Sequence, residues 1–198
     1  MTVSKETIVK ASIRILDREG VEGLSMRTIA KELGIKASSL YWHFNGKQEL
    51  YGAISEDLCL RLKMPAESDS PRDYLSEIYN AYRAMLLSVR DSVPVLENSM
   101  PNTPRRLEII RAISAAFLIM GVPAEKLMTI SNLFNNYVLS FVADECRFKN
   151  RTAEEIREFE KLLSPHDKTL LRVPDDFDGQ FLYGLQVMFA GLEAVGSA

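Results

Sequence analysis

A short segment near the N-terminus, residues 36–47, combines small polar side chains with aromatic and basic ones. Its notable members are Lys36, Ala37, Ser38, Ser39, Tyr41, Trp42, His43 and Lys47. Small side chains allow the end of a helix to approach DNA closely, and amide, hydroxyl and indole groups can donate to phosphate oxygens. Lys47 begins a further predicted helix, where the ammonium group and the helix dipole both favour an anion. The chemistry indicated is the binding of nucleic-acid phosphate.

Core packing is the alternative for Tyr41 and Trp42, because aromatic side chains are usually buried. Leu40 and Phe44, however, lie at positions i and i+4 and fill the inner face of the same helix, with Ile35 beside them. The aromatic side chains between them therefore cannot all point inward.

Three helices are predicted to position this segment, over residues 4–19, 26–33 and 37–44. Ser25 is a good N-cap for the second helix, and Gly34 ends it. A tight turn containing Gly34 joins the second helix to the third, and the small Ala30 allows the two to cross closely. This is the layout of a helix-turn-helix DNA-binding domain.

The segment from Ser25 to Ile54 resembles the helix-turn-helix of the TetR family of transcriptional repressors. The matching residues are Thr28 (one place from the usual position), Ile29, Ala30, Gly34, Leu40, Tyr41, His43, Phe44, Lys47 and Leu50. The resemblance implies that the third helix enters the major groove, where Tyr41, His43 and Lys47 mainly anchor phosphates. Base reading then falls to Lys36, Ala37, Ser38, Ser39 and Trp42, with Arg27 near the start of the second helix.

Beyond residue 46 the apolar spacing stays helical, which predicts an all-α fold. We expect a helix-turn-helix domain over 1–46, a connecting helix over 47–64 that ends before Pro65, and a ligand-binding and dimerisation domain over 65–198. Later helices are predicted from Pro71, over 104–120, 123–148, 152–163 and 178–195, with a surface excursion over 164–178.

The larger domain also resembles the tetracycline-repressor branch of the family. Where that branch uses histidines, an asparagine and a phenylalanine to hold a magnesium–tetracycline complex, this chain has Lys63, Leu96, Ile78 and Tyr82. Only Asp144 stands in for the glutamate on the magnesium side. The resemblance therefore argues against a metal-chelated drug, and neither a metal ion nor a cofactor is expected.

A pocket for a small, largely apolar effector is expected instead. Its candidate residues are Tyr82, Met85, Leu86, Leu96, Ile113, Phe117, Phe134 and Tyr137, with Asn135, Asn136 and Asp144 as orienting polar groups. For each residue taken singly, packing in a solid core is the simpler alternative.

Dimerisation is expected through the helices near 123–148 and 178–195, which carry more apolar surface than one subunit covers. Gly184, Ala190 and Gly191 would allow two helices to approach closely. A homodimer presents two recognition helices to a palindromic operator in double-stranded DNA. We expect an effector to shift the connecting helix and change the spacing of these helices.

Charge and composition fit this interpretation. Residues 1–50 hold eight Lys/Arg and six Asp/Glu, whereas the rest of the chain holds sixteen and twenty-one. A basic head on an acidic body suits a protein that approaches phosphate with one end. The sequence shows neither a signal peptide nor an apolar run of about 18 residues, so a soluble, cytoplasmic protein with no membrane contact is expected.

Two other functional classes were weighed. An enzyme is disfavoured because the sequence has no Ser-His-Asp set, glycine-rich phosphate loop or zinc spacing, and only two histidines. The acidic cluster Asp175, Asp176 and Asp178 has the character of a solvated loop. A regulator without a ligand, controlled by a partner protein or acting as an activator, stays as the alternative. Cys59 and Cys146 match no redox or metal motif.

Overall fold

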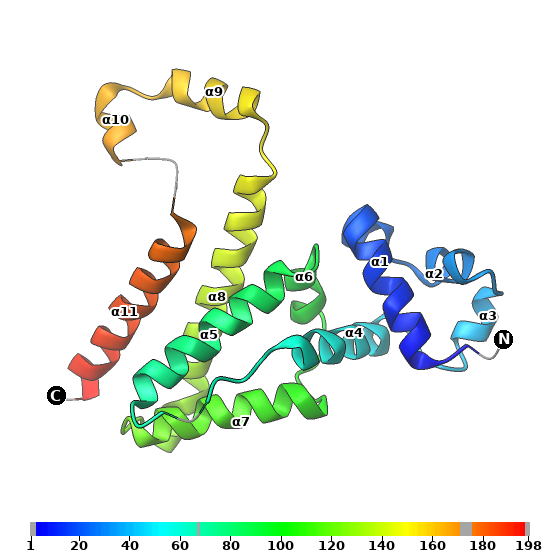
Figure 1. The fold of residues 1–198 in the computed structure, drawn as a ribbon, viewed down its shortest axis with the longest axis horizontal. Helices are drawn as coiled ribbons and strands as arrows, with labels where there is room; N and C mark the ends of the chain where they lie inside the picture. The colour runs from blue at the N-terminus through cyan, green and yellow to red at the C-terminus, as the bar shows by residue number, and fades with distance from the viewer. Residues whose placement is uncertain (1–2, 67, 171–175, 197–198) are drawn as a thin grey trace. The chain divides into compact units, whose positions relative to one another are not determined.

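The computed structural model describes residues 3–66, 68–170 and 176–196, and this part of the chain is helical without any strand. Eleven α-helices and one 3-10 turn make up the described elements (Figure 1). The all-α prediction is confirmed. Contacts divide the chain into two compact units, Met1–Ser131 and Asn132–Ala198, and each is described by itself.

The first unit begins with the predicted helix-turn-helix. Helix α1 spans Lys5–Gly23, α2 spans Met26–Leu33 and α3 spans Ala37–Leu40. Ser25 caps α2, because its side-chain oxygen accepts from the backbone N–H of Thr28 at 3.0 Å. Gly34 ends α2 in the left-handed region at φ +64°, as glycine does most readily.

Two of these helices differ from their predicted bounds. Helix α3 ends at Leu40 instead of Phe44, because the chain continues as turns, although the N–H of Phe44 still donates to the carbonyl of Leu40. Helix α1 was expected to end at Glu19, but helical structure resumes after Gly20 and reaches Gly23. Gly20 itself lies at φ +72° and ψ −175°, which interrupts the helix.

The rest of the first unit consists of α4 (Lys47–Arg61), α5 (Pro71–Leu87), α6 (Ser92–Glu97) and α7 (Pro104–Ile119). The prediction that α4 runs to Met64 is wrong. Leu62 is extended, and its carbonyl accepts from the guanidinium of Arg105 on α7 at 3.0 Å. This contact satisfies one of the carbonyl groups that a helix end leaves unpaired.

A 3-10 turn, Ala124–Lys126, precedes α8 (Leu127–Lys149), whose last eighteen residues belong to the second unit. Three further helices follow: α9 (Ala153–Leu162), α10 (Pro165–Leu170) and α11 (Phe177–Gly196). The predicted capping box at Thr152 and Glu155 is present at the start of α9. The surface excursion expected over 164–178 contains helix α10. Its residues 171–175, including Asp175, lie outside the described residues.

Candidate nucleic-acid interface

The segment after the α2–α3 turn separates buried from exposed side chains sharply. Leu40 and Phe44 are buried within the helix-turn-helix domain, residues 1–46, which we call the head. In contrast, Tyr41 is 56% exposed and Trp42 is 89% exposed. The two aromatic side chains between the buried pair therefore lie outside the core. Tyrosine and tryptophan are enriched at interfaces, because one part of each side chain is apolar and another can donate a hydrogen bond.

The other predicted DNA-contacting residues are all at least partly accessible to solvent. Lys36, Ser38, Lys47 and Arg27 are exposed, and Ala37, Ser39 and His43 are half-buried. Lys47 also lies over the ring of Tyr51, with its ammonium nitrogen 5.2 Å from the ring centroid. The ammonium group is therefore positioned beside the turn while it stays open to solvent.

Glu49 fixes the turn between α3 and α4, and the sequence prediction did not include it. Its carboxylate accepts from the backbone and side-chain nitrogens of Asn45, both at 2.9 Å, and from the ammonium group of Lys5 at 3.1 Å. The hydrogen bond from the backbone N–H of Asn45, followed in size by the one from Lys5, holds the pKa of Glu49 below its usual value. The acidic residue three places into a helix was a local signal that could have indicated this cap.

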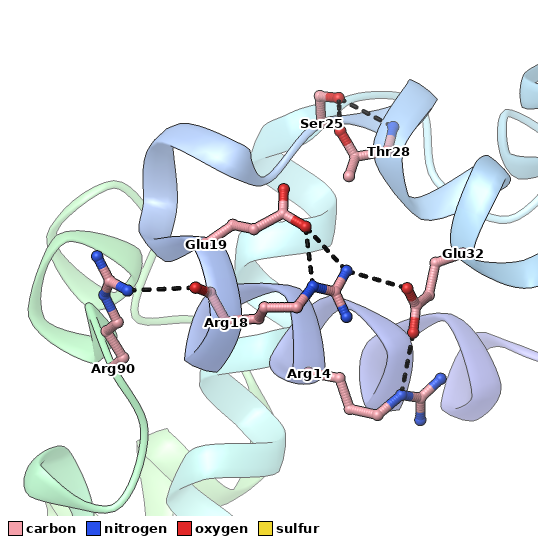
Figure 2. A network of polar contacts seen from close by, with 7 residues as sticks. All are labelled: Arg14, Arg18, Glu19, Ser25, Thr28, Glu32 and Arg90. Atoms are coloured by element: carbon pink, nitrogen blue, oxygen red, sulfur yellow. Dashed lines mark hydrogen bonds and ion pairs between the residues drawn. The ribbon is translucent and has the colours of Figure 1, made fainter.

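A network of charges joins α1 to α2 (Figure 2). Glu32 accepts from the guanidinium of Arg18 at 3.1 Å and from that of Arg14 at 3.4 Å, and Arg18 also contacts Glu19 at 2.9 Å. The hydrogen bond from Arg18 is the main reason that the pKa of Glu32 is lowered. Arg27 and Lys31 lie beside this network, because they line an open polar pocket together with Glu19 and Glu32.

The predicted effector-binding residues divide between the two units. Six lie in the first unit, on α5, α6 and α7: Tyr82, Met85, Leu86, Leu96, Ile113 and Phe117. Met85, Leu86, Leu96 and Phe117 are buried, and the other two are partly so. Cys59 of α4 is also buried, which raises the pKa of its thiol to about 11. The thiol is therefore protonated and unreactive at neutral pH.

The other five, Phe134, Asn135, Asn136, Tyr137 and Asp144, lie on α8 in the second unit, and Asn136 is exposed. Phe134 packs against Phe189 with ring centroids 4.8 Å apart, and the hydroxyl of Tyr137 donates to the carbonyl of Phe181 at 2.9 Å. These two residues therefore join α8 to α11. Asn135 is half-buried. Asp144 is exposed and forms an ion pair with Arg147.

Comparison with known proteins covers nearly the whole chain. The family described as bacterial regulatory proteins, tetR family, matches residues 8–54, and the tetracyclin repressor-like C-terminal domain matches residues 64–195. The chain belongs to the TetR family. A tetracycline repressor of class A from Escherichia coli (transposon 1721) is 29% identical over 94% of this chain and 88% of the relative.

Solved structures of similar fold also match nearly the whole chain. BioQ, solved with its natural double-stranded DNA operator, is 27% identical with a TM-score of 0.75, covering 98% of this chain and 99% of that one. ActR from Streptomyces coelicolor in complex with actinorhodin has a TM-score of 0.85 over 100% of both chains. At 23% identity the ActR likeness shows the fold alone.

The protein is thus a TetR-family transcriptional regulator with a helix-turn-helix DNA-binding domain and a tetracycline-repressor-like C-terminal domain. Family membership also decides against the enzyme alternative, since the matching relatives are regulatory proteins. Among the described residues, no group of three or more His, Cys, Asp or Glu side chains could hold a metal ion. Nor does any helix of the described chain have the length and apolar character to span a membrane.

Proposed function

We propose that this TetR-family regulator is a homodimeric repressor that binds a palindromic operator and is released by a small, largely apolar ligand. The observation that carries the proposal is the exposure of Tyr41 and Trp42 on a segment whose inner face is closed by Leu40 and Phe44. The 27% identical BioQ, solved with its operator, supports a DNA-binding role for the equivalent part of this chain.

In this proposal the head divides its contacts between phosphates and bases. Tyr41, His43 and Lys47 donate to phosphate oxygens, which position the head on the duplex without reading sequence. The small residues Ala37, Ser38 and Ser39 allow the start of α3 to approach the bases. Lys36, Trp42 and Arg27 then supply the longer side chains that reach base edges in the major groove.

Apolar side chains that the subunit leaves exposed support dimerisation. Leu133 of α8 and Leu182, Tyr183 and Val187 of α11 are all exposed. These residues fall in the helices near 123–148 and 178–195, where the sequence predicts the interface. Burial of such a surface in a two-fold dimer would stabilise the dimer, and two joined heads bind a two-part operator far more tightly than one.

The proposed effector site is in the larger domain, where α5, α6 and α7 supply mainly apolar side chains. We assign residues 1–46 to DNA binding, 47–64 to the connection and 65–198 to effector binding and dimerisation. Ser55 of α4 shares a hydrogen bond of 2.8 Å with Ser99, just after α6. A shift of α6 on ligand binding would therefore reach α4, and operator affinity would change by the ligand's differential affinity for the two states.

The decisive experiment is a fluorescence-anisotropy titration of the full-length protein against the intergenic DNA beside its own gene, at several salt concentrations. We expect sequence-selective binding by a dimer that weakens steeply as salt rises, because phosphate binding releases counterions. Random duplex DNA of equal length is the control. If no part of the intergenic region binds better than that control, the proposal that this region holds the operator is contradicted. Addition of apolar compounds to the complex then tests release.

A further inference from the structure

The turn between α5 and α6 contacts the far end of α1 through backbone groups (Figure 2). The N–H of Arg90 donates to the carboxylate of Asp17 at 3.1 Å, and its guanidinium donates to the carbonyl of Arg18 at 3.4 Å. The carboxylate of Asp91 accepts from the N–H of Val21 at 2.7 Å. These three hydrogen bonds, which we call the α1–turn contact, join residues about seventy positions apart in the sequence.

The interruption of α1 at Gly20 makes this contact possible. With φ at +72°, Gly20 breaks the regular path of the helix, and the N–H of Val21 points to the Asp91 carboxylate. A Cβ atom at position 20 would lie 2.5 Å from the Asp91 carboxylate oxygen Oδ2. Glycine is therefore required for two reasons, the positive φ and the close approach.

Asp91 is itself in an unusual conformation. It adopts φ +56°, and it is the one residue other than glycine with a positive φ in the described part of the chain. Aspartate tolerates this region better than most residues, but the conformation needs support from its surroundings. Asp91 is also the residue immediately before α6, so the contact with α1 is made by the N-terminal end of that helix.

The opposite end of α6 contacts the connecting helix. Ser99 is buried, and its hydroxyl bonds to Ser55 of α4 at 2.8 Å and accepts from Arg106 at 2.8 Å. The six residues of α6 thus lie between two contacts, one to α1 and one to α4. Helix α1 belongs to the DNA-reading head, and α4 follows the head directly in the chain.

Within the head, the same part of α1 is joined to α2. Arg18, whose carbonyl accepts from Arg90, also donates its guanidinium to Glu32 of α2. Helix α2 in turn packs against α3. A displacement of the α5–α6 turn can therefore reach α3 through a contact at each step.

We propose that Asp91 is a positioning residue for operator binding, which fixes the end of α1 to α6 and so sets the separation of the two heads in the dimer. The inference rests on the proposed function, because head separation has meaning only for a dimer on a two-part operator. In this arrangement α4 alone does not orient the head. The α1–turn contact supplies a second point of attachment, and two attachments fix the orientation of the head.

The test uses the full-length protein and an operator selected from random duplex DNA, together with operators lengthened or shortened by one base pair between the half-sites. For the wild-type protein we expect the Kd to rise about tenfold or more on changed spacing, the scale of one lost base contact per dimer. For Asp91→Gly, which removes the carboxylate but suits φ +56°, we expect that ratio to fall to about threefold or less. Gly20→Ala should have the same effect, because its Cβ displaces the Asp91 carboxylate.

One further readout and one control variant separate positioning from damage to the head. Affinity for an isolated half-site should be the same in Asp91→Gly as in the wild-type protein, since the residues that read DNA are unchanged. Asp69→Gly, which removes an exposed aspartate from the loop before α5, is the matched control and should keep the wild-type spacing ratio. If both Asp91→Gly and Gly20→Ala keep that ratio, the inference is overturned while the proposed function stands. If the wild-type protein selects no sequence over random DNA, the proposed function fails and the inference fails with it.

Discussion

The two ends of the chain use aromatic side chains in opposite ways. In the head, Tyr41 and Trp42 are exposed, and polar contacts such as the Glu49 cap and the Glu32 network join the helices. In the second unit, aromatic rings themselves join α8 to α11, as Phe134 does with Phe189. Phe134 and Phe189 in the second unit therefore contribute to stability, whereas Tyr41 and Trp42 in the head are available to a partner.

The largest expected effect is on stability, from Phe189→Ala in the second unit. Phe189 is completely buried and packs against Phe134, so the substitution should lower the free energy of unfolding by roughly 3–5 kcal/mol. Trp42→Ala, which removes a larger but exposed ring, should change it by no more than about 0.5 kcal/mol. Urea denaturation followed by circular dichroism measures both, and equal losses would remove the contrast between the two regions.

The next effect is on DNA binding, where the exposed ring of Trp42 should matter although it adds little to stability. Trp42→Ala is expected to weaken operator binding by about 1–3 kcal/mol, the scale of one specific base contact. Leu60→Ala, which also truncates an exposed apolar residue but on α4, should leave the affinity unchanged. Anisotropy at fixed salt provides the comparison, and an unaltered Kd for the Trp42 variant would show that this ring is not part of the interface.

A smaller effect tests the polar component of the α8–α11 contact. Tyr137→Phe removes the hydroxyl that donates to the Phe181 carbonyl but keeps the ring, which stacks on Phe181 at 5.5 Å. We expect a loss of about 0.5–1.5 kcal/mol in the free energy of unfolding. The matched control is Tyr41→Phe in the head, an exposed tyrosine, with both variants measured without DNA. Denaturation curves that coincide for the two variants would show that ring packing alone carries this contact.

The smallest effect concerns the pH dependence of the head. Arg18 lowers the pKa of Glu32 below its ordinary value of 4.5, so the folded state favours the charged carboxylate. This stabilisation is present above the ordinary pKa and is lost as the pH falls through the lowered one. Melting temperatures between neutral and acidic pH should therefore fall slightly less for Glu32→Gln than for the wild-type protein. Because Glu32 is only partly buried, high salt should diminish the difference, and identical pH profiles would count against the network.

Local signals predicted the elements of this fold well. Ser25, Gly34 and Thr152 act as the sequence indicates, because a cap or a left-handed turn depends on neighbouring residues only. Distant contacts account for the errors. Helix α4 ends early where Arg105 of α7 takes the carbonyl of Leu62, and α1 passes Gly20 where Asp91 meets its next N–H.

The candidate sites show the same division. That Leu40 and Phe44 would be buried followed from their spacing, and this implied exposure of the residues between them. Gly184 was expected to let two helices approach closely, and within the subunit it lies against α8, where a Cβ at position 184 would collide with the Tyr137 hydroxyl. Spacing within a helix predicts which residues share a face, but it does not say which helix that face meets.

Trp42 is the single tryptophan of the chain, and it is among the most exposed of the large apolar side chains in the described residues. When the protein is excited at the red edge of its absorption band, its fluorescence therefore comes from the indole of Trp42, just after α3. Quenching by iodide should be nearly complete in the free protein and should decrease when that indole is covered. Under the proposed DNA contacts, this indole is an intrinsic optical probe of operator occupancy, and no dye needs to be attached to the protein.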